Sequence, residues 1–358
     1  MEIVQHVYQI KVPLAGLPGT STAASSPFKA WKEGRSQITQ KTTESLPVSP
    51  VNSYLIEGEN GNLLIDTGWN TPEAYSALSA DLKSYGFTIK DITHIATTHM
   101  HPDHCGMAGK IKQLSNANLS VSELESKLMH ERYVDVDGLL EKMLQLLLSN
   151  GVPPSEAQSL AKSSLPARTL VVVVEPDRKL KDGDIISFNP FEFRVIETPG
   201  HSPGHISFYE ASHKWLFSGD HILPDITPNI SYHPQSGPDP LGDYLKSLEV
   251  IYDLEISFAF PGHGPAFTGV RPIIESIIRH HEERRRSIKK ALESKTKTAY
   301  LISQEIPWQV DLKQPDYNLM SVLNRRFAVS ETIAHLEHMA AESEIGKSIE
   351  NGITMYFA

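Results

Sequence analysis

The chain of 358 residues contains one cysteine, and no run of it approaches the roughly 20 consecutive apolar residues that a membrane-spanning helix needs. An internal disulfide is therefore excluded, so the fold does not depend on an oxidising compartment. The first residues, Met1 to His6, lack the basic and apolar segments of a signal peptide. We expect a cytoplasmic protein that makes no use of a membrane.

Positive charge is also scarce, because 33 Lys and Arg against 43 Asp and Glu give a formal net charge of −10. Such a chain is not attracted as a whole to nucleic acid or anionic lipid, although a local basic face would escape this argument. We therefore expect a small-molecule substrate rather than a nucleic-acid partner.

The densest group of chemically active side chains lies at 99–104, in the sequence His-Met-His-Pro-Asp-His. It follows an apolar, β-branched run at 92–97, which predicts a turn at the end of a strand. Alternate residues of an extended segment face the same side, so His99 and His101 are expected together. Imidazole and carboxylate groups are ligands that zinc and similar cations prefer. With Asp103 and His104, this segment predicts a metal site.

Three more candidate ligands each follow an apolar, strand-like run and lie in a turn. They are His201, Asp220 and His263. Each alone is commonly an ordinary turn residue. Three such turns, taken with the cluster at 99–104, instead indicate one composite site.

This order, HxHxDH followed by an isolated His, Asp and His, resembles the pattern of the metallo-β-lactamase superfamily. Asp66, in the sequence Leu-Ile-Asp-Thr-Gly, is similar to the early aspartate of that family. The resemblance spans about 50–270 and implies an α/β fold, a four-layer αββα sandwich. It also implies one metal at His99, His101 and His201, a second at Asp103, His104 and His263, and Asp220 as the bridge. Asp66 would then hydrogen-bond to Asp103 or to a ligand histidine.

A pair of neighbouring cations would determine which reaction the site can catalyse. Two divalent ions about 3.5–4 Å apart share a water, lower its pKa to about 7 and polarise a carbonyl or phosphoryl oxygen. A metal-bridging hydroxide then attacks without a protein nucleophile, and Asp103 can pass a proton to the leaving group. We expect two zinc ions, although manganese and iron bind the same ligand types.

Two further side chains are candidates for the site. Either the pair Tyr232-His233, twelve residues after Asp220, donates a hydrogen bond to the leaving group or carbonyl, with Tyr232 as the catalytic candidate, or Tyr232 lies in a loop without contacting the substrate. Cys105 is either a reactive thiol or a small residue that fills space beside the ligands.

The remaining histidines fall into two groups. His94, His205 and His221 adjoin the motifs and are candidates for orienting ligands. Those farther away are expected to be solvated: His6, His130, His213, His280, His281, His335 and His338.

The chain divides into a catalytic domain, 1–270, and a C-terminal domain, 271–358. The long loop at 13–50 is either a lid over the metals or disordered. A helical insertion at about 115–182 carries more leucine than one face needs, so it buries against the core, a second subunit or an acyl or aromatic group of the substrate. The core is expected to contain hairpins rather than repeated βαβ units.

The C-terminal domain is expected to contain a charged helix from 271 to 292, helices near 316–326 and 330–343, and a hairpin around Asn351-Gly352. This set resembles the winged-helix segment of one superfamily branch, which includes a β-lactamase-like protein with ribonuclease activity (β-lactamase-like protein 2) and is similar to glyoxalase II-like hydrolases. The segment is balanced in charge, whereas a nucleic-acid-binding module is basic. We expect it to dock against the core or to form a homodimer.

The sequence therefore predicts a binuclear hydrolase of an ester, thioester or lactone with a small acyl or aromatic group. The apolar insertion suits such a substrate, and the composition does not suit repeated phosphate contacts. Two alternatives use the same ligands or a subset of them: a metal-dependent endoribonuclease and a mononuclear-iron oxygenase of the persulfide dioxygenase type. A purely structural role is disfavoured, because structural zinc sites are closed and usually rich in thiolate.

Overall fold

The computed structural model describes residues 1–14, 50–293, 295–308 and 316–358. The loop expected at 13–50, and with it the question of a lid, lies almost wholly outside the described residues.

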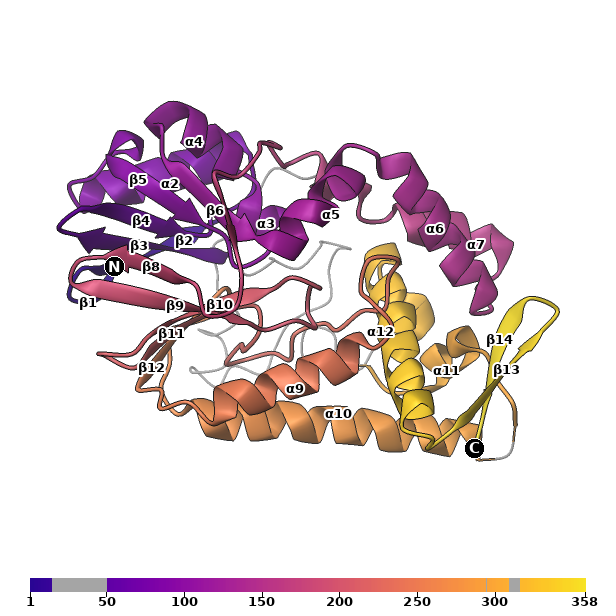
Figure 1. Ribbon diagram of the computed structural model, residues 1–358. Helices are drawn as coiled ribbons and strands as arrows, with labels where there is room; N and C mark the ends of the chain where they lie inside the picture. Colours follow the sequence, from indigo (N-terminus) through magenta and orange to yellow (C-terminus); the bar gives the residue numbers. More distant parts are fainter. Residues whose placement is uncertain (15–49, 294, 309–315) are drawn as a thin grey trace, which may run out of the picture.

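Two β-sheets face each other at the centre of the molecule (Figure 1). The first has seven strands in the order of the chain: β1 (Glu2–Val4), β2 (Val7–Val12), β3 (Val51–Gly58), β4 (Gly61–Ile65), β5 (Ile92–Ala96), β6 (Asn118–Ser122) and β7 (Arg178–Leu180). The second has the order β12 (Phe258–Pro261), β11 (Trp215–Gly219), β10 (Ile206–Glu210), β9 (Phe191–Glu197) and β8 (Ile185–Phe188). Buried side chains of both sheets, Tyr54 and Phe217 among them, form the core between them.

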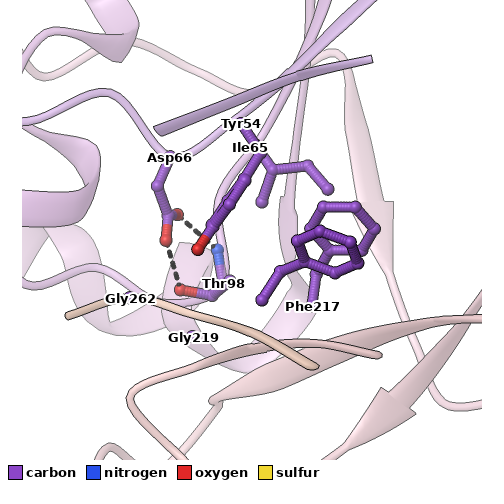
Figure 2. A pocket seen from close by; sticks show the side chains of 8 residues that line it. Tyr54, Ile65, Asp66, Thr98, Phe217, Gly219 and Gly262 are labelled. Carbon is purple, nitrogen blue, oxygen red and sulfur yellow. Dashed lines mark hydrogen bonds between the residues drawn. The ribbon is translucent and has the colours of Figure 1, made fainter. Parts of the chain in front are cut away.

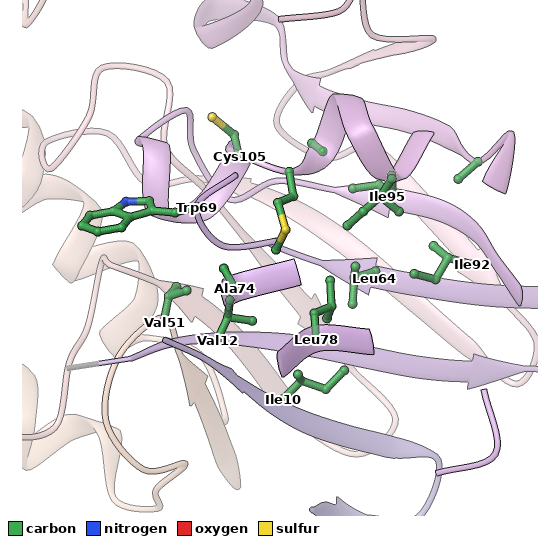
Figure 3. Close-up of a cluster of buried hydrophobic side chains, with 14 of the residues drawn as sticks. Ile10, Val12, Val51, Leu64, Trp69, Ala74, Leu78, Ile92, Ile95 and Cys105 are labelled. Carbon is green, nitrogen blue, oxygen red and sulfur yellow. The ribbon is translucent and has the colours of Figure 1, made fainter. Parts of the chain in front are cut away.

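Helices cover the outer face of each sheet. On the first sheet, α2 (Pro72–Ser84) and α4 (Ala108–Ser115) bury leucine and isoleucine side chains against the strands (Figure 3). On the second, α9 (Pro240–Tyr252) and α10 (Val270–Leu292) do the same. The expected αββα sandwich is therefore confirmed.

Parallel strand pairs bring the candidate ligands to one edge. β4 pairs with β5 and β5 with β6 in parallel, and β11 pairs in parallel with β12. A parallel pair needs a crossover connection, here made by helices such as α2 and α9. The expected hairpins are present, for example β3–β4 and β10–β11, but the core also contains βαβ units, which the expectation of hairpins rather than repeated βαβ units did not include. The carboxyl ends of β5, β11 and β12 meet at the same edge of the sandwich, where the metal motifs follow them.

The insertion is shorter than the sequence suggested. Its first and last parts are β6 and β7, which extend the first sheet. The sequence of β6, Asn-Leu-Ser-Val-Ser, has too few apolar residues to reveal a buried strand. The helices between them are α5 (Glu123–Tyr133), α6 (Val136–Ser149), α7 (Pro154–Lys162) and α8 (Leu165–Arg168).

The apolar face of α6 packs against the C-terminal part of the chain. Met143 and Leu147 are buried in one cluster with Ile288 of α10 and Tyr356 near the C-terminus. The sequence left three partners open for this face: the core, a second subunit or a substrate group. The structure shows packing within the chain.

The C-terminal segment contains three helices and a hairpin, with bounds that partly differ from those expected. Its elements are α10, α11 (Ala299–Glu305), α12 (Val322–Ala341), β13 (Gly346–Glu350) and β14 (Ile353–Phe357), with the short 3-10 helix η2 (Tyr317–Leu319) before α12. The two helices expected at 316–326 and 330–343 are largely one, because neither Gly nor Pro interrupts 322–341. The expected hairpin is present, and α12 packs against α9 (Figure 1).

Three histidines expected to be solvated are buried instead: His281, His335 and His338. The Nδ1 of His281 lies 3.1 Å from the Nε2 of His335, and the Nδ1 of His335 lies 3.0 Å from the carbonyl oxygen of Glu331. Burial lowers the pKa of both rings, so both are neutral and each donates from its Nδ1. No local pattern reveals this pair, because its members lie on α10 and α12.

Among the described residues, none of the helices combines the length and the apolar character needed to cross a membrane.

Replacing Leu147 by Ala is expected to lower the free energy of unfolding by about 2–5 kcal/mol, because the side chain is fully buried. Chemical denaturation measures the change, with Leu124→Ala, at a residue 43% exposed, as the control. Unchanged stability with a raised KM for bulky substrates would place Leu147 in a substrate pocket instead.

Acid should destabilise the chain through the histidine pair. Burial lowers the pKa of His335 from 6.5 to about 3, so only the unfolded chain takes up this proton as the pH falls from 6.5 towards 3. Stability from this group is complete above pH 6.5 and falls by about 2 kcal/mol by pH 5. In His335→Gln the loss of stability between pH 7 and pH 5 should be smaller by that amount. An acid dependence identical to that of the exposed control His130→Gln would contradict the assignment.

Candidate metal centre

The turn at 99–104 is held by Asp66, which follows β4. Its carboxylate accepts hydrogen bonds from the backbone N–H and the Oγ1 of Thr98, both at 2.8 Å (Figure 2), and lies 2.8 Å from the Nδ1 of His104. Asp66 has a positive φ of 56°, a conformation that Asp tolerates better than most residues. The aspartate expected to hydrogen-bond to a ligand histidine thus contacts His104.

The seven candidate ligands lie together. One group contains His99, His101 and His201, with the Nδ1 of His101 at 2.9 Å from the Nε2 of His99 and 3.0 Å from that of His201. A second contains Asp103, His104 and His263, with a carboxylate oxygen of Asp103 at 3.4 Å from the Nε2 of His263. These are the two sets that the family resemblance implied.

Asp220 lies between the two groups. Its Oδ2 is 3.6 Å from the Nε2 of His201, 3.4 Å from that of His104 and 3.6 Å from that of His263. A single oxygen therefore faces imidazoles of both groups, as a bridging ligand must.

Three features show that the residues fit cations. The Nδ1 of His101 lies 2.9–3.0 Å from the Nε2 of His99 and of His201, so three potential ligand atoms gather in one place. The Nε2 of His104 and the Oδ1 of Asp220 are buried without a hydrogen-bond partner among the described residues. Finally, a Cβ at Gly262 would lie 2.3 Å from that Oδ1 and 2.7 Å from the His104 ring, so only glycine leaves room for them. The ligand set, nitrogen and oxygen only, suits zinc, manganese or iron.

Burial and neighbouring charge set the protonation of the imidazoles. Burial and nearby positive groups hold the pKa of His99 and His101 well below the usual range, so these rings are neutral, as metal binding requires. Burial also lowers the pKa of His104 and His263, but the carboxylates of Asp220 and Asp103 outweigh it and raise the pKa of both. In that group a cation would take the place of a proton.

Hydrogen bonds to the other ring nitrogen orient the ligands. The Nδ1 of His201 lies 3.0 Å from the carbonyl oxygen of Asn229, and that of His263 lies 3.2 Å from the carbonyl oxygen of Pro50. Partners of this kind fix the tautomer and the direction of the metal-binding nitrogen.

Two of the three histidines beside the motifs are buried, and one supports a ligand. The Nε2 of His205 accepts a hydrogen bond from the backbone N–H of Asp220 at 3.2 Å, while its Nδ1 lies 2.8 Å from Thr198 Oγ1. His221 is buried and has no side-chain hydrogen bond among the described residues. His94 lies apart, with its ring edge against Phe188.

A close-packed region lies behind the centre, lined by Tyr54, Asp66, Thr98 and Phe217 among others (Figure 2). It has no room for a water molecule. The Asp66 hydrogen bonds therefore lie in a dry environment, where charge-assisted bonds are strong.

Cys105 follows the ligand turn directly and is 1% exposed, packed in the cluster that includes Trp69 (Figure 3). Burial raises the pKa of its thiol. Since the thiolate is the reactive form, the residue fills space beside the ligands rather than acting as a nucleophile.

Tyr232 is partly buried against the cluster of the C-terminal helices. Its backbone N–H donates to the carbonyl oxygen of Ser330. Burial and the charge of Glu337 raise the pKa of its hydroxyl, which places that group beside the C-terminal segment. Its catalytic role stays a prediction. The next residue, His233, accepts a hydrogen bond from the backbone N–H of Gln235 at its Nδ1.

Sequence reasoning missed several residues that support the site. Thr98 adjoins the histidine motif and follows a strand, so its position was a usable signal. Asn229, by contrast, contributes only a backbone carbonyl to His201, which no side-chain pattern reveals. The buried pair of Arg132 and Glu125, 2.9 Å apart, also supports the site, because Glu125 accepts the backbone N–H of Gly204.

Residues 46–263 match the model of the metallo-beta-lactamase superfamily, and the chain therefore belongs to this superfamily. Membership makes it a metallo-hydrolase at the level of the family and implies divalent metal ions at the His and Asp clusters.

Individual relatives agree with the family. The chain is 28% identical over 322 residues to probable metallo-hydrolase YqjP of Bacillus subtilis, covering 87% of this chain and 93% of that protein. It is 26% identical over 227 residues to acyl-coenzyme A thioesterase MBLAC2 of Gallus gallus, covering 62% and 74%. The crystal structure of a metallo-beta-lactamase family protein of Thermus thermophilus, TTHA1429, is similar over 99% of both chains, with a TM-score of 0.78 and 27% identity.

Replacing Asp66 by Asn should weaken metal binding by about 10- to 100-fold, because an amide cannot accept all three hydrogen bonds from Thr98 and His104. Metal retained after dialysis against graded chelator measures the change. Asp253→Asn, at an exposed residue, is the matched control. Equal retention in both variants would show that Asp66 does not orient the ligands.

Proposed function

We propose that the chain is a binuclear metal-dependent hydrolase of a thioester or another carboxylic ester, with two zinc ions as its cofactors. The observation that carries this proposal is the position of Asp220 Oδ2, within 3.4–3.6 Å of histidines of both ligand groups. One shared oxygen suits two cations held close together. A single metal at His99, His101 and His201 would leave the second group, Asp103, His104 and His263, without a cation to bind.

When bound, two such cations lower the pKa of a shared water to about 7 and polarise the carbonyl oxygen that is attacked. The chain supplies the surroundings. Asp103 is partly exposed and lies at the outer side of its group, where a carboxylate oxygen can accept a proton and return it to the leaving group. The close-packed region that Asp66 and Thr98 help to line has no room for water beside the hydrogen bonds that hold the ligand turn.

The choice of bond rests on two arguments. The chicken relative is named an acyl-coenzyme A thioesterase, and its similarity covers 62% of this chain. The net charge of −10 does not suit a long polyanion. The leucines of α6 no longer add support, because Leu147 and its neighbours pack against the C-terminal helices.

The test combines metal analysis with a panel of substrates: a butyryl thioester, p-nitrophenyl butyrate, a lactone and a short RNA. We expect about two zinc ions per chain and turnover of a thioester or ester. His101→Ala and Asp220→Asn should abolish this turnover, whereas the exposed control His130→Ala should keep it.

Two outcomes would contradict the proposal. One iron per chain without hydrolysis would indicate an oxygenase of the persulfide dioxygenase type. Cleavage of RNA alone would indicate an endoribonuclease.

A further inference from the structure

Three arginines from separate parts of the chain lie together beside the candidate metal centre. Arg132 is near the end of α5, Arg168 is the last residue of α8 and Arg326 is in the first half of α12. The Nη1 of Arg168 donates to the carbonyl oxygen of Arg132 at 3.3 Å, and the Nη1 of Arg326 donates to Ser164 Oγ, just before α8, at 2.7 Å. The helical insertion and the C-terminal segment thus meet at these side chains.

His233 connects this cluster to the metal ligands. Its pKa is held well below the usual range by removal from water, then by Arg132, Arg326 and Arg168, and also by His201. The His233 ring is joined to this cluster through Gln235, whose side-chain oxygen accepts a hydrogen bond from the Nε of Arg132 at 3.0 Å. Arg132 in turn pairs with Glu125, which accepts from the backbone N–H of Gly204 near His201. The Nδ1 of His233 accepts the backbone N–H of Gln235 at 3.2 Å, which leaves the neutral ring with an Nε2–H to donate.

The positive charges of the cluster are incompletely compensated. Arg132 is paired with Glu125 at 2.9 Å. Within the described ranges, neither Arg168 nor Arg326 has a carboxylate within 4 Å, and each makes one side-chain hydrogen bond out of the five that a guanidinium can donate. Both side chains are only partly exposed.

This arrangement is costly for the chain alone. Burial and the charge of Arg168 lower the pKa of Arg326 to about 10, which shows that like charges repel there. The chain has more acidic than basic residues, so the lack of carboxylate partners is specific to this place. The adjacent Arg325, by contrast, is paired with Glu156 at 2.8 Å. Partly desolvated guanidinium groups without partners are arranged as in sites for carboxylate or phosphate, which Arg binds through two parallel hydrogen bonds.

We propose that Arg168, Arg326 and the Nε2–H of His233 form a subsite for an oxyanion, a carboxylate or phosphate, carried by the substrate of the metal centre. The inference rests on the proposed function and narrows it to anionic thioesters or esters. It also gives the insertion and the C-terminal segment a shared role in substrate binding, since Arg168 belongs to the first and Arg326 to the second.

Three thioesters with the same reacting group test the proposal: S-butyryl-N-acetylcysteamine, which is neutral, S-succinyl-N-acetylcysteamine, with a carboxylate on the acyl side, and S-butyryl-4′-phosphopantetheine, with a phosphate on the thiol side. We expect kcat/KM for one of the anionic compounds to exceed that of the neutral one by about 10- to 100-fold. Which compound is preferred identifies the oxyanion.

The preference should depend on the two arginines. In Arg168→Gln and Arg326→Gln, KM for the preferred compound should rise by about the same factor, while kcat and the turnover of the neutral thioester stay as they are. Arg286→Gln, at an exposed arginine of α10, is the matched control. Arg326→Lys should restore part of the preference, because it restores the charge.

Binding is also measured without turnover. Sodium sulfate should raise the Tm of the metal-loaded wild type and of Arg286→Gln above the value in sodium chloride of equal ionic strength, and it should do so less in the other two variants. Removing a repelled charge should not lower the Tm of Arg326→Gln in chloride.

The outcomes separate this inference from the proposed function. Equal sulfate stabilisation in all four proteins, or an anion preference that survives both substitutions, would overturn the subsite. An arginine-dependent sulfate effect without hydrolysis of any thioester or ester would support the subsite and contradict the proposed function. A large loss of Tm in Arg326→Gln in chloride would show a structural role for Arg326 and overturn its place in the subsite.

Discussion

The hydrogen bonds accepted by the Asp66 carboxylate hold together the turn on which the candidate centre depends. They join the end of β4 to Thr98 and His104, and so fix both ends of the segment that carries four of the seven ligands. They work because β4 and β5 are parallel neighbours, so that the two strands end side by side. The second sheet presents Asp220 and His263 in the same way, at the ends of β11 and β12.

The negative charge of the ligand carboxylates explains why the site needs bound cations. Carboxylates and imidazoles of the centre lie at 3.4–3.7 Å from one another, and without a cation the acids beside His104 and His263 raise the pKa of both histidines. The centre therefore needs bound positive charge, whether protons or metal ions, to offset its carboxylates. Arg168 and Arg326 have the opposite imbalance, since neither has a carboxylate within 4 Å among the described residues. A substrate with a reactive carbonyl and an anionic end would match both.

The sequence predicted the parts of the site whose residues form local motifs. It did not predict contacts between residues that are far apart in the chain. The cluster at 99–104, with His201, Asp220 and His263, was identifiable because each ligand follows a strand-like run and lies in a turn. The αββα sandwich followed from the family resemblance. By contrast, β6 and the edge strand β7 are short and of mixed polarity, and the pair His281 and His335 forms between two helices. Arg168 and Arg326 come together only after folding, so local patterns carry no sign of them.

The central claim is that the seven ligands hold two cations with Asp220 between them. Crystals of the protein purified without added metal, measured on both sides of the zinc absorption edge, test this most directly. We expect two anomalous peaks about 3.5–4 Å apart, one on each side of the Asp220 carboxylate. A single peak at His99, His101 and His201, with Asp103 and His263 turned away, would contradict it.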